Sequence, residues 1–241
     1  MFGLGTIINT LAVIAGGLIG YFFGGLLKER YKDGLTVACG VSVLFIAIAG
    51  AMEGMLGVNN TSVVSKNSML VTICILLGTI VGEIIDIDGI FEKFGKWLKI
   101  KTGNAKDVKF VDGFLTTSFT ICIGAMAIVG SIQDGMAGDY SILAIKSVLD
   151  FIIVMVLAGS LGKGCIFSAI PIFVLQGSVT VLAKFIEPIM TEAALNNLSM
   201  IGSILIFCVG INLVWDRKIR VANMLPSIIF AVIAVYLPFN I

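Results

Sequence analysis

The chain consists of long apolar runs separated by short segments that hold most of its charges. Hydrophobic residues make up 58% of it and charged residues only 13%, a membrane composition, because a water-soluble domain of 241 residues needs far more charge on its surface. A run of about 20 apolar residues is enough for one helical crossing of a bilayer. We therefore predict an all-α polytopic membrane protein, a single transmembrane domain with about eight transmembrane helices. They are expected near residues 2–27, 35–57, 67–85, 109–133, 141–161, 165–186, 198–215 and 223–239.

The residue types that the chain lacks exclude common enzyme classes. Histidine is absent, which removes Ser-His and Cys-His catalysis and H-E-x-x-H zinc sites. The five cysteines all lie inside apolar runs without a Cys-x-x-Cys pair, so we expect neither disulfides nor metal ligands. The net charge of +1 gives no electrostatic basis for binding nucleic acid. We expect no enzymatic activity, no cofactor and no metal.

The lysines and arginines are divided unevenly between the two sides of the predicted bundle. With the N-terminus outside, 13 of the 16 fall in inner loops, the last of which holds Arg217 and Lys218, and only Lys66, Lys146 and Lys184 lie outside or within a span. Inner loops of membrane proteins carry an excess of lysine and arginine. We therefore expect a multi-pass protein of the bacterial inner (plasma) membrane with both termini outside.

One short motif occurs twice in the first 138 residues. AIAGAMEGMLG covers residues 47–57 and AIVGSIQDGMAG covers residues 127–138, and a glycine-containing segment precedes each of them, GGLIG at 16–20 and GTIVG at 78–82. This spacing predicts repeated helical hairpins, with repeat unit 1 over 1–57 and repeat unit 2 over 67–138. Residues 139–241 are compatible with further hairpins.

The second repeat unit carries an insertion on the inner side. In DGIFEKFGKWLKIKTG the apolar residues Ile90, Phe91, Phe94 and Trp97 recur at helical spacing, and lysines take the other positions. The pattern predicts an amphipathic helix near 88–100 at the inner leaflet, with its lysines towards anionic lipid. The rival interpretation is a helix that a calmodulin-like partner binds.

Three segments carry a resemblance to a known family. GTIINTLAVIAGGLIG near the start, GAMAIVGSIQDG in the middle and IRVANMLPSI near the end resemble the YqgA/YdfK-like family of bacterial integral membrane proteins, a domain-of-unknown-function family. The resemblance extends over essentially the whole chain. It implies a multi-span inner-membrane protein and brings neither a settled activity nor catalytic residues.

The repeated motif places a carboxylate near the outer end of a span in each copy. Glu53 and Asp134 are either interfacial residues beside packing glycines or parts of a site, since a carboxylate within a bilayer is costly. Glycine-interrupted helix ends can free backbone carbonyls beside such acids, as in transporters. For this second interpretation we expect both motifs at one polar cavity in the outer half of the bundle. The candidate substrate or ion pathway comprises Glu53, Ser131, Gln133, Asp134, Lys146, Asp150 and Gln176, with Ser178 and Thr180 nearby.

Two charged residues fall within the fifth predicted span. Lys146 and Asp150 are spaced as an i,i+4 ion pair that neutralises both charges, and the alternative is a proton or ion relay. Asn9 and Asn212 are expected to make hydrogen bonds between helices.

Small residues at helical spacing predict close helix packing, and they also suit a homodimer interface. The glycines expected to pack helices or to interrupt them are Gly16, Gly20, Gly50, Gly54, Gly78, Gly82, Gly130, Gly135 and Gly177.

These patterns favour a transporter of a small polar or ionic solute, with a site near the outer half of the bundle. The alternative is a membrane scaffold or partner subunit that transports nothing. A channel and a membrane-embedded enzyme are further alternatives. The substrate, the coupling ion and the oligomeric state do not follow from the sequence.

Overall fold

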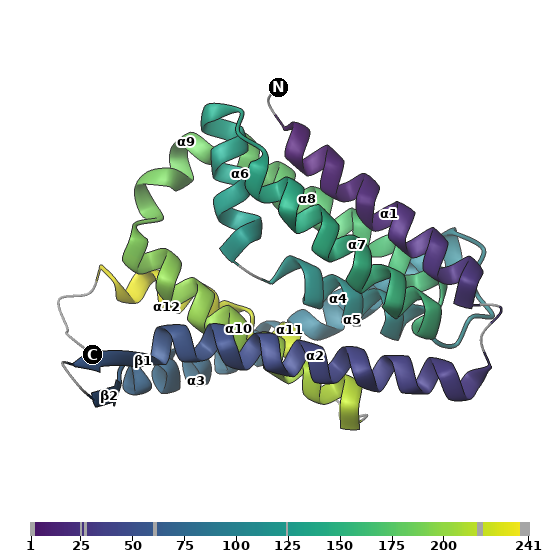
Figure 1. Ribbon diagram of the computed structural model, residues 1–241, viewed down its shortest axis with the longest axis horizontal. Helices are drawn as coiled ribbons and strands as arrows, with labels where there is room; N and C mark the ends of the chain where they lie inside the picture. Colours follow the sequence, from purple (N-terminus) through teal and green to yellow (C-terminus); the bar gives the residue numbers. More distant parts are fainter. Residues whose placement is uncertain are drawn as a thin grey trace.

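A computed structural model describes residues 3–24, 26, 28–59, 62–123, 125–215 and 219–236 of the chain. Arg217 and Lys218 of the last basic loop, and the end of the eighth predicted span at 237–239, lie outside these residues. The described chain is almost entirely helical (Figure 1). Its elements are α1 (Leu4–Gly24), α2 (Glu29–Met55), β1 (Leu56–Asn59), β2 (Ser62–Ser65), α3 (Ser68–Ile85), α4 (Ile87–Lys101), α5 (Phe110–Cys122), α6 (Ala125–Ala137), α7 (Ser141–Leu161), η1 (Lys163–Ser168), α8 (Ala169–Val181), α9 (Ala183–Ile186), η2 (Glu187–Ile189), α10 (Glu192–Trp215), α11 (Val221–Met224) and α12 (Pro226–Ala234).

The helical membrane class is confirmed. Among the described residues, 6 helical segments are long and apolar enough to cross a membrane, and the bent pair of α5 and α6 makes up to 7. The shorter apolar segment Val221–Ala234 lies where the eighth span was predicted. The expected number of about eight crossings therefore agrees approximately with the structure.

The structure differs from the prediction in three places. The span predicted at 109–133 is two helices that meet at 63°, because Ile123 is extended and ends α5. The helix α10 begins at Glu192, ahead of the predicted start at residue 198. A short antiparallel hairpin, β1 and β2, joins α2 to α3 and was not predicted.

The helices form two groups in Figure 1. One contains α1, α6, α7 and α8, and the other contains α2, α3, α10 and α12. The helix α5 contacts members of both groups, and α2 packs against α7. The first group contains the buried polar residues described below.

Glycines bring the backbones of α1 and α7 together. Three glycines of α1 meet three backbone positions of α7, Gly16 at Phe151, Gly20 at Met155 and Gly24 at Gly159. Both sets of numbers rise by four, so the two helices run parallel. A side chain at any of these glycines would meet main-chain atoms of α7, which explains why the packing requires glycine there.

Other glycines make the equivalent contacts in the second group. Gly50 and Gly54 of α2 lie against Ser203 and Met200 of the antiparallel helix α10. Gly78 of α3 lies against Ser227 of α12, and Gly82 lies against Asn223 of α11. These glycine faces are covered by helices of the same chain, so they are not a free homodimer surface.

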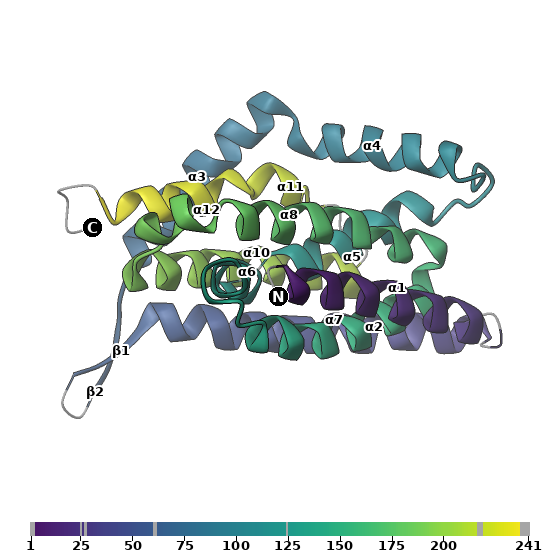
Figure 2. The same ribbon diagram turned by 90° about the horizontal axis from the view of Figure 1, so that it is seen from above.

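The helix predicted near 88–100 is α4. Its Phe91 ring packs edge-on against Phe119 of α5, with 5.4 Å between the ring centroids, and Leu98 is buried. In Figure 2, α4 flanks the bundle and extends along the long axis of the molecule, and it does not lie across the ends of the other helices. The placement of α4 at the inner leaflet stays a prediction.

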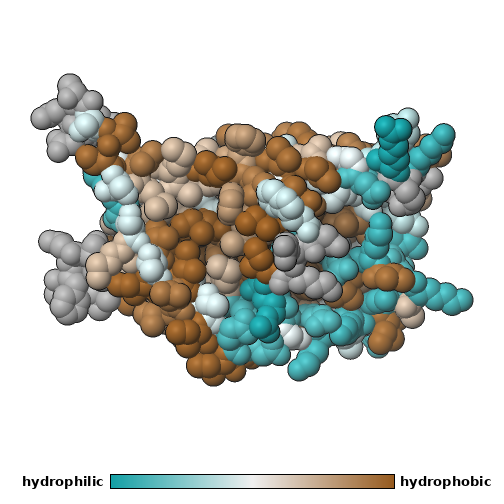
Figure 3. Space-filling view, turned by 90° about the horizontal axis from the view of Figure 1, so that it is seen from below, coloured by the Kyte–Doolittle hydropathy of each residue, from teal (hydrophilic) through white to brown (hydrophobic). Residues whose placement is uncertain are grey.

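The surface divides into an apolar part and a charged end. Figure 3 shows hydrophobic side chains over most of the face viewed and hydrophilic ones gathered towards one end. That end contains the loop between α1 and α2 and the loop between α4 and α5 (Figures 1 and 2). Four basic residues in these loops or in the helix ends that flank them are exposed, namely Lys28, Arg30, Lys101 and Lys106. The distribution suits a bundle with an apolar belt in lipid and one basic side.

Candidate functional site

The carboxylate of Asp134 is buried between α6 and the start of α1. Its exposed fraction is 0%, and its Oδ2 accepts a hydrogen bond of 2.9 Å from the backbone N–H of Gly5. This N–H belongs to the first turn of α1, where backbone N–H groups have no partner within the helix and the helix dipole favours negative charge. The other oxygen, Oδ1, has no hydrogen-bond partner among the described residues.

Residues of α8 face the same region. The hydroxyls of Thr6 on α1 and Thr180 on α8 lie 3.4 Å apart, and both residues are buried. On α6, Gly135 lies so close to the Thr180 carbonyl that a side chain would not fit. These contacts hold α1, α6 and α8 together around Asp134.

Two further side chains near Asp134 are buried without partners. Ser131 precedes Asp134 by one turn of α6, and Gln176 precedes Thr180 by one turn of α8. Both have an exposed fraction of 0%. The Ser131 hydroxyl and both polar atoms of the Gln176 amide make no hydrogen bond within the described chain. Each such buried, unpaired group costs about 1–3 kcal/mol, so the cluster is unusual for a purely structural core.

An ion pair lies deeper in the same group of helices. The Lys146 Nζ is 2.8 Å from Asp150 Oδ1 and 2.7 Å from Oδ2, and the Asn9 amide donates to Oδ2 at 2.9 Å. The Lys146 Nζ also donates to the Ile121 carbonyl at 2.8 Å. Ile121 is in the last turn of α5, where the break before α6 leaves carbonyls without helical partners. The Lys146 ammonium therefore also donates a hydrogen bond to a carbonyl that the helix break leaves without a helical partner.

We refer to this set of buried residues as the polar core. It comprises Thr6, Asn9, Ser131, Asp134, Lys146, Asp150, Gln176 and Thr180.

Apolar side chains close the polar core at its far end. Val13 lies one turn after Asn9 on α1, Val154 lies one turn after Asp150 on α7, and Ile172 lies one turn before Gln176 on α8. All three are fully buried in one cluster with Ile121 and Leu157. Within the described chain, these packed side chains separate the polar core from the other end of the first group of helices.

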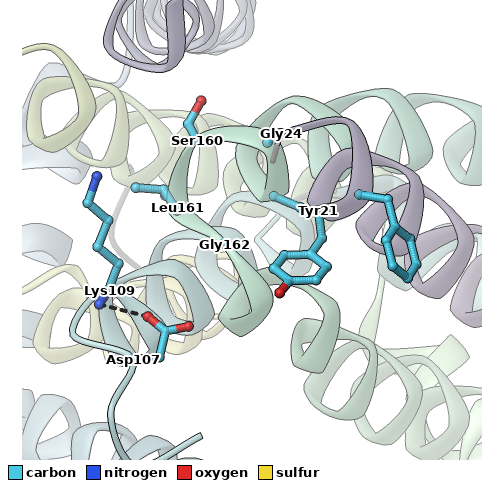
Figure 4. Close-up of a pocket in the computed structure, with 10 residues that line it drawn as sticks. Tyr21, Gly24, Asp107, Lys109, Ser160, Leu161 and Gly162 are labelled. Carbon is cyan, nitrogen blue, oxygen red and sulfur yellow. Dashed lines mark hydrogen bonds between the residues drawn. The ribbon is translucent and has the colours of Figure 1, made fainter. Parts of the chain in front are cut away.

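Beyond the apolar cluster lies a pocket of about 440 Å³ at the basic end. It is lined by Tyr21 and Gly24 of α1, Ser160 of α7, the following Gly162, and Asp107 and Lys109 before α5. Figure 4 shows Tyr21 and Asp107 on opposite sides of Gly162, and the Lys109 N–H donates to Asp107 Oδ1 at 3.1 Å. Gly162 has φ 85°, a conformation that glycine tolerates.

The loop between α6 and α7 contains one carboxylate with a shifted pKa. Asp139 Oδ1 accepts hydrogen bonds from the Ser141 hydroxyl at 2.6 Å and from the Ser141 N–H at 3.0 Å. These bonds lower the pKa of Asp139, because they stabilise the charged carboxylate. The side chain is exposed, so it does not belong to the polar core.

The structure does not bring Glu53 and Asp134 to one cavity, contrary to the expectation from the repeat. Glu53 is exposed and lines a separate pocket of about 310 Å³ with Lys66, Asn67 and Asn197. That pocket lies between the end of α2, the hairpin and α10, and Asp134 is not among its lining residues. The reason is that α2 packs on α10, whereas α6 packs on α8.

The remaining residues predicted for the pathway or for helix interruption lie outside the polar core. Gln133 is only partly buried, and Ser178 is exposed with its hydroxyl bonded to the Leu175 carbonyl. Gly130 lies within α6 and faces Leu143, whereas a methyl group added at Gly177 would have no atom of the described residues within 4 Å. The helix break falls near residue 123 and at none of the glycines of the two motifs.

Sequence reasoning missed two members of the site. Thr6 stands three residues before Asn9 in an otherwise apolar run, and this polar spacing was a usable signal. The Ile121 carbonyl is a backbone group, and only the helix break exposes it.

The fold and the site define a multi-pass helical membrane protein with a buried, incompletely paired polar core. Residues 4–236 match the model of the family described as "Protein of unknown function (DUF554)", so the chain belongs to this family. It is 30% identical over 232 residues to the "Uncharacterized membrane protein YdfK" of Bacillus subtilis (strain 168), covering 96% of this chain and 95% of that protein. It is 29% identical to the "Uncharacterized protein YqgA" of Escherichia coli (strain K12), covering 95% and 94% of the two chains. No solved structure matches it.

Proposed function

We propose that the protein transports a small polar solute across the bacterial inner membrane, and that the solute binds in the polar core between α1, α6 and α8. The observation that carries this proposal is the set of buried, unpaired polar atoms around Asp134, namely Asp134 Oδ1, Ser131 Oγ and the Gln176 amide. Proteins pair nearly all of their buried polar groups. A bound solute would supply the missing partners.

The chemistry of the site favours a solute with hydrogen-bond donors. The Asp134 carboxylate oxygen and the Ser131 hydroxyl accept hydrogen bonds, and the Gln176 amide both donates and accepts. A solute with an amine or several hydroxyl groups matches this set. Because the site is enclosed by packed helices, the solute must be small.

The bend between α5 and α6 supports a route for the solute. Transporters place binding sites beside interrupted helices, where the two halves can tilt separately. A tilt of α6 about the break would open the region around Asp134. We take the basic end as the inner side. Release of the solute towards that end additionally requires that the side chains of the apolar cluster, which includes Val13 and Ile172, move apart.

The test is a thermal-shift screen of the purified chain against sugars, amines, amino acids and small acids. A ligand that binds the native state raises the unfolding temperature. Hits are then measured on Asp134→Asn and on the matched control Asp139→Asn, whose carboxylate is exposed on the loop after α6.

We expect a hit to stabilise the wild type and the control, to lose most of its effect on Asp134→Asn, and to enter vesicles that contain the protein. A hit that stabilises both variants equally would place binding outside the polar core. Vesicles that take up none of the binding solutes would favour the alternative, a membrane scaffold or partner subunit.

A further inference from the structure

The ammonium group of Lys146 is held as a bound cation would be held. Three oxygens surround Nζ at 2.7–2.8 Å: both carboxylate oxygens of Asp150 and the Ile121 carbonyl. The Lys146 side chain is only 9% exposed and that of Asp150 only 4%. A carboxylate beside a carbonyl freed by a broken helix is a typical cation site within a bilayer.

We infer that the break between α5 and α6 forms a monovalent-cation site, and that the lysine ammonium occupies it permanently. The C-terminal end of α5 carries partial negative charge, which adds to the charge of Asp150 and favours a cation at this point. Without a cation, the buried Asp150 carboxylate would keep only the Asn9 amide and its charge would be uncompensated, and the Ile121 carbonyl would lack a partner, at a cost that buried charges rarely sustain.

A further oxygen is available close to the cation site. The Asn9 amide uses its Nδ2 to bind Asp150 Oδ2, and its Oδ1 is buried without a hydrogen-bond partner in the described chain. A free cation, which can shift within the site, has access to more oxygen ligands than the tethered ammonium uses. The site therefore suits a small monovalent cation once the lysine side chain is removed.

This inference rests on the proposed function in one respect, since it concerns whether transport requires a coupling ion. The position where other transporters hold a cation is taken by the chain's own ammonium. Solute movement through the polar core therefore requires neither Na⁺ nor K⁺.

The test uses the purified full-length Lys146→Ala variant. Its unfolding temperature is measured in choline chloride and after replacement of choline by Na⁺, K⁺, ammonium or methylammonium at constant ionic strength. The control is Lys184→Ala, which removes an exposed lysine near the end of α8. Wild type and control should respond equally little to the exchange.

We expect Lys146→Ala to be destabilised in choline and to recover roughly 5–10 °C at about 100 times the Kd of one small cation. An equal response of Lys146→Ala and Lys184→Ala to every cation would overturn the inference. If Lys146→Ala does not fold, Lys146→Gln, whose amide retains a donor for Ile121, is measured in the same way, and the absence of a cation-specific shift there overturns it too.

The thermal measurement needs no transport activity, so the two proposals fail separately. A cation-specific shift in a protein that moves no solute supports the cation site and contradicts the transporter. Solute uptake by the wild type that requires Na⁺ or K⁺ supports the proposed transport function. It overturns the inference that the Lys146 ammonium takes the place of a coupling cation.

Discussion

At the scale of single residues, the polar core contains charges in two different situations. Lys146 and Asp150 satisfy one another, and the Ile121 carbonyl and Asn9 complete their hydrogen bonds. Asp134 has one oxygen bonded to a backbone N–H and one without a partner. The first arrangement is a closed structural unit, and the second is open to a ligand.

The closed unit predicts a difference between single and double substitution. Asp150→Asn leaves the Lys146 ammonium buried with an uncharged partner, and removal of one member of a buried ion pair costs about 3–5 kcal/mol. Lys146→Met with Asp150→Leu removes both charges at similar volume, so it should be more stable than Asp150→Asn, although it stays below the wild type because the Ile121 carbonyl and the Asn9 amide lose their partners. Unfolding of both variants in the same detergent measures the difference. A single variant as stable as the double one would contradict this account of the pair.

At the scale of elements, the positions of most helices along the chain could be predicted from the sequence. Which helices pack against each other could not. Apolar length alone identified α1, α2, α3 and α7, because a bilayer sets the length of a crossing. The break near Ile123 has no proline, and Gly124, which follows it in the sequence, is one of many glycines within the apolar runs, so sequence patterns predicted one continuous span. Glu53 and Asp134 were expected together because their motifs match, but packing on different partner helices separates them.

Two glycines with different surroundings, Gly20 in the contact between α1 and α7 and Gly177 on α8, predict opposite effects of a Gly→Ala substitution. A methyl group at Gly20 would meet the Met155 backbone, which cannot move without displacing α7, so Gly20→Ala should cost about 1–3 kcal/mol. At Gly177 no atom of the described chain lies within 4 Å of an added methyl group, so Gly177→Ala should stabilise α8 by up to about 1 kcal/mol. Thermal unfolding of the two variants side by side tests the pair. If Gly20→Ala is as stable as Gly177→Ala, the close contact is not required.

The exposed side of α4 predicts contact with lipid. Ile90, Phe94 and Trp97 form an exposed apolar stripe beside the exposed Lys93 and Lys96. In a Trp215→Phe background, brominated acyl chains should quench Trp97 fluorescence strongly, and more so with anionic lipid, since lysines attract it. The control replaces Lys93 by Glu and should weaken the dependence on anionic lipid. A Trp97 that brominated lipid does not quench would place this stripe away from the bilayer.

At the scale of the whole molecule, the helices form two groups, and the polar core lies in the first. The group of α2, α3, α10 and α12 packs through glycine contacts, and the separate pocket at Glu53 lies at the end of α2 and α10. The basic loops after α1 and α4 lie at one end of the molecule, and the β1–β2 hairpin lies at the other (Figure 1). This polarity fits the positive-inside argument, which predicts that the hairpin lies on the outer side.

The last prediction concerns this orientation. In a background without the five native cysteines, Ser65→Cys on the hairpin and Lys106→Cys in the loop before α5 each place one exposed thiol at opposite ends of the molecule. A membrane-impermeant maleimide should label Ser65→Cys in intact cells or spheroplasts, and Lys106→Cys only after the membrane is opened. The physical reason is that translocation of lysine-rich loops is disfavoured, so the segment with Lys101, Lys106 and Lys109 stays inside. A permeant maleimide that labels both variants equally is the control for thiol reactivity. Labelling of Lys106→Cys from outside, together with protection of Ser65→Cys, would invert the topology, and the pocket lined by Asp107 and Gly162 would then face outward while Asp134 lay on the inner side.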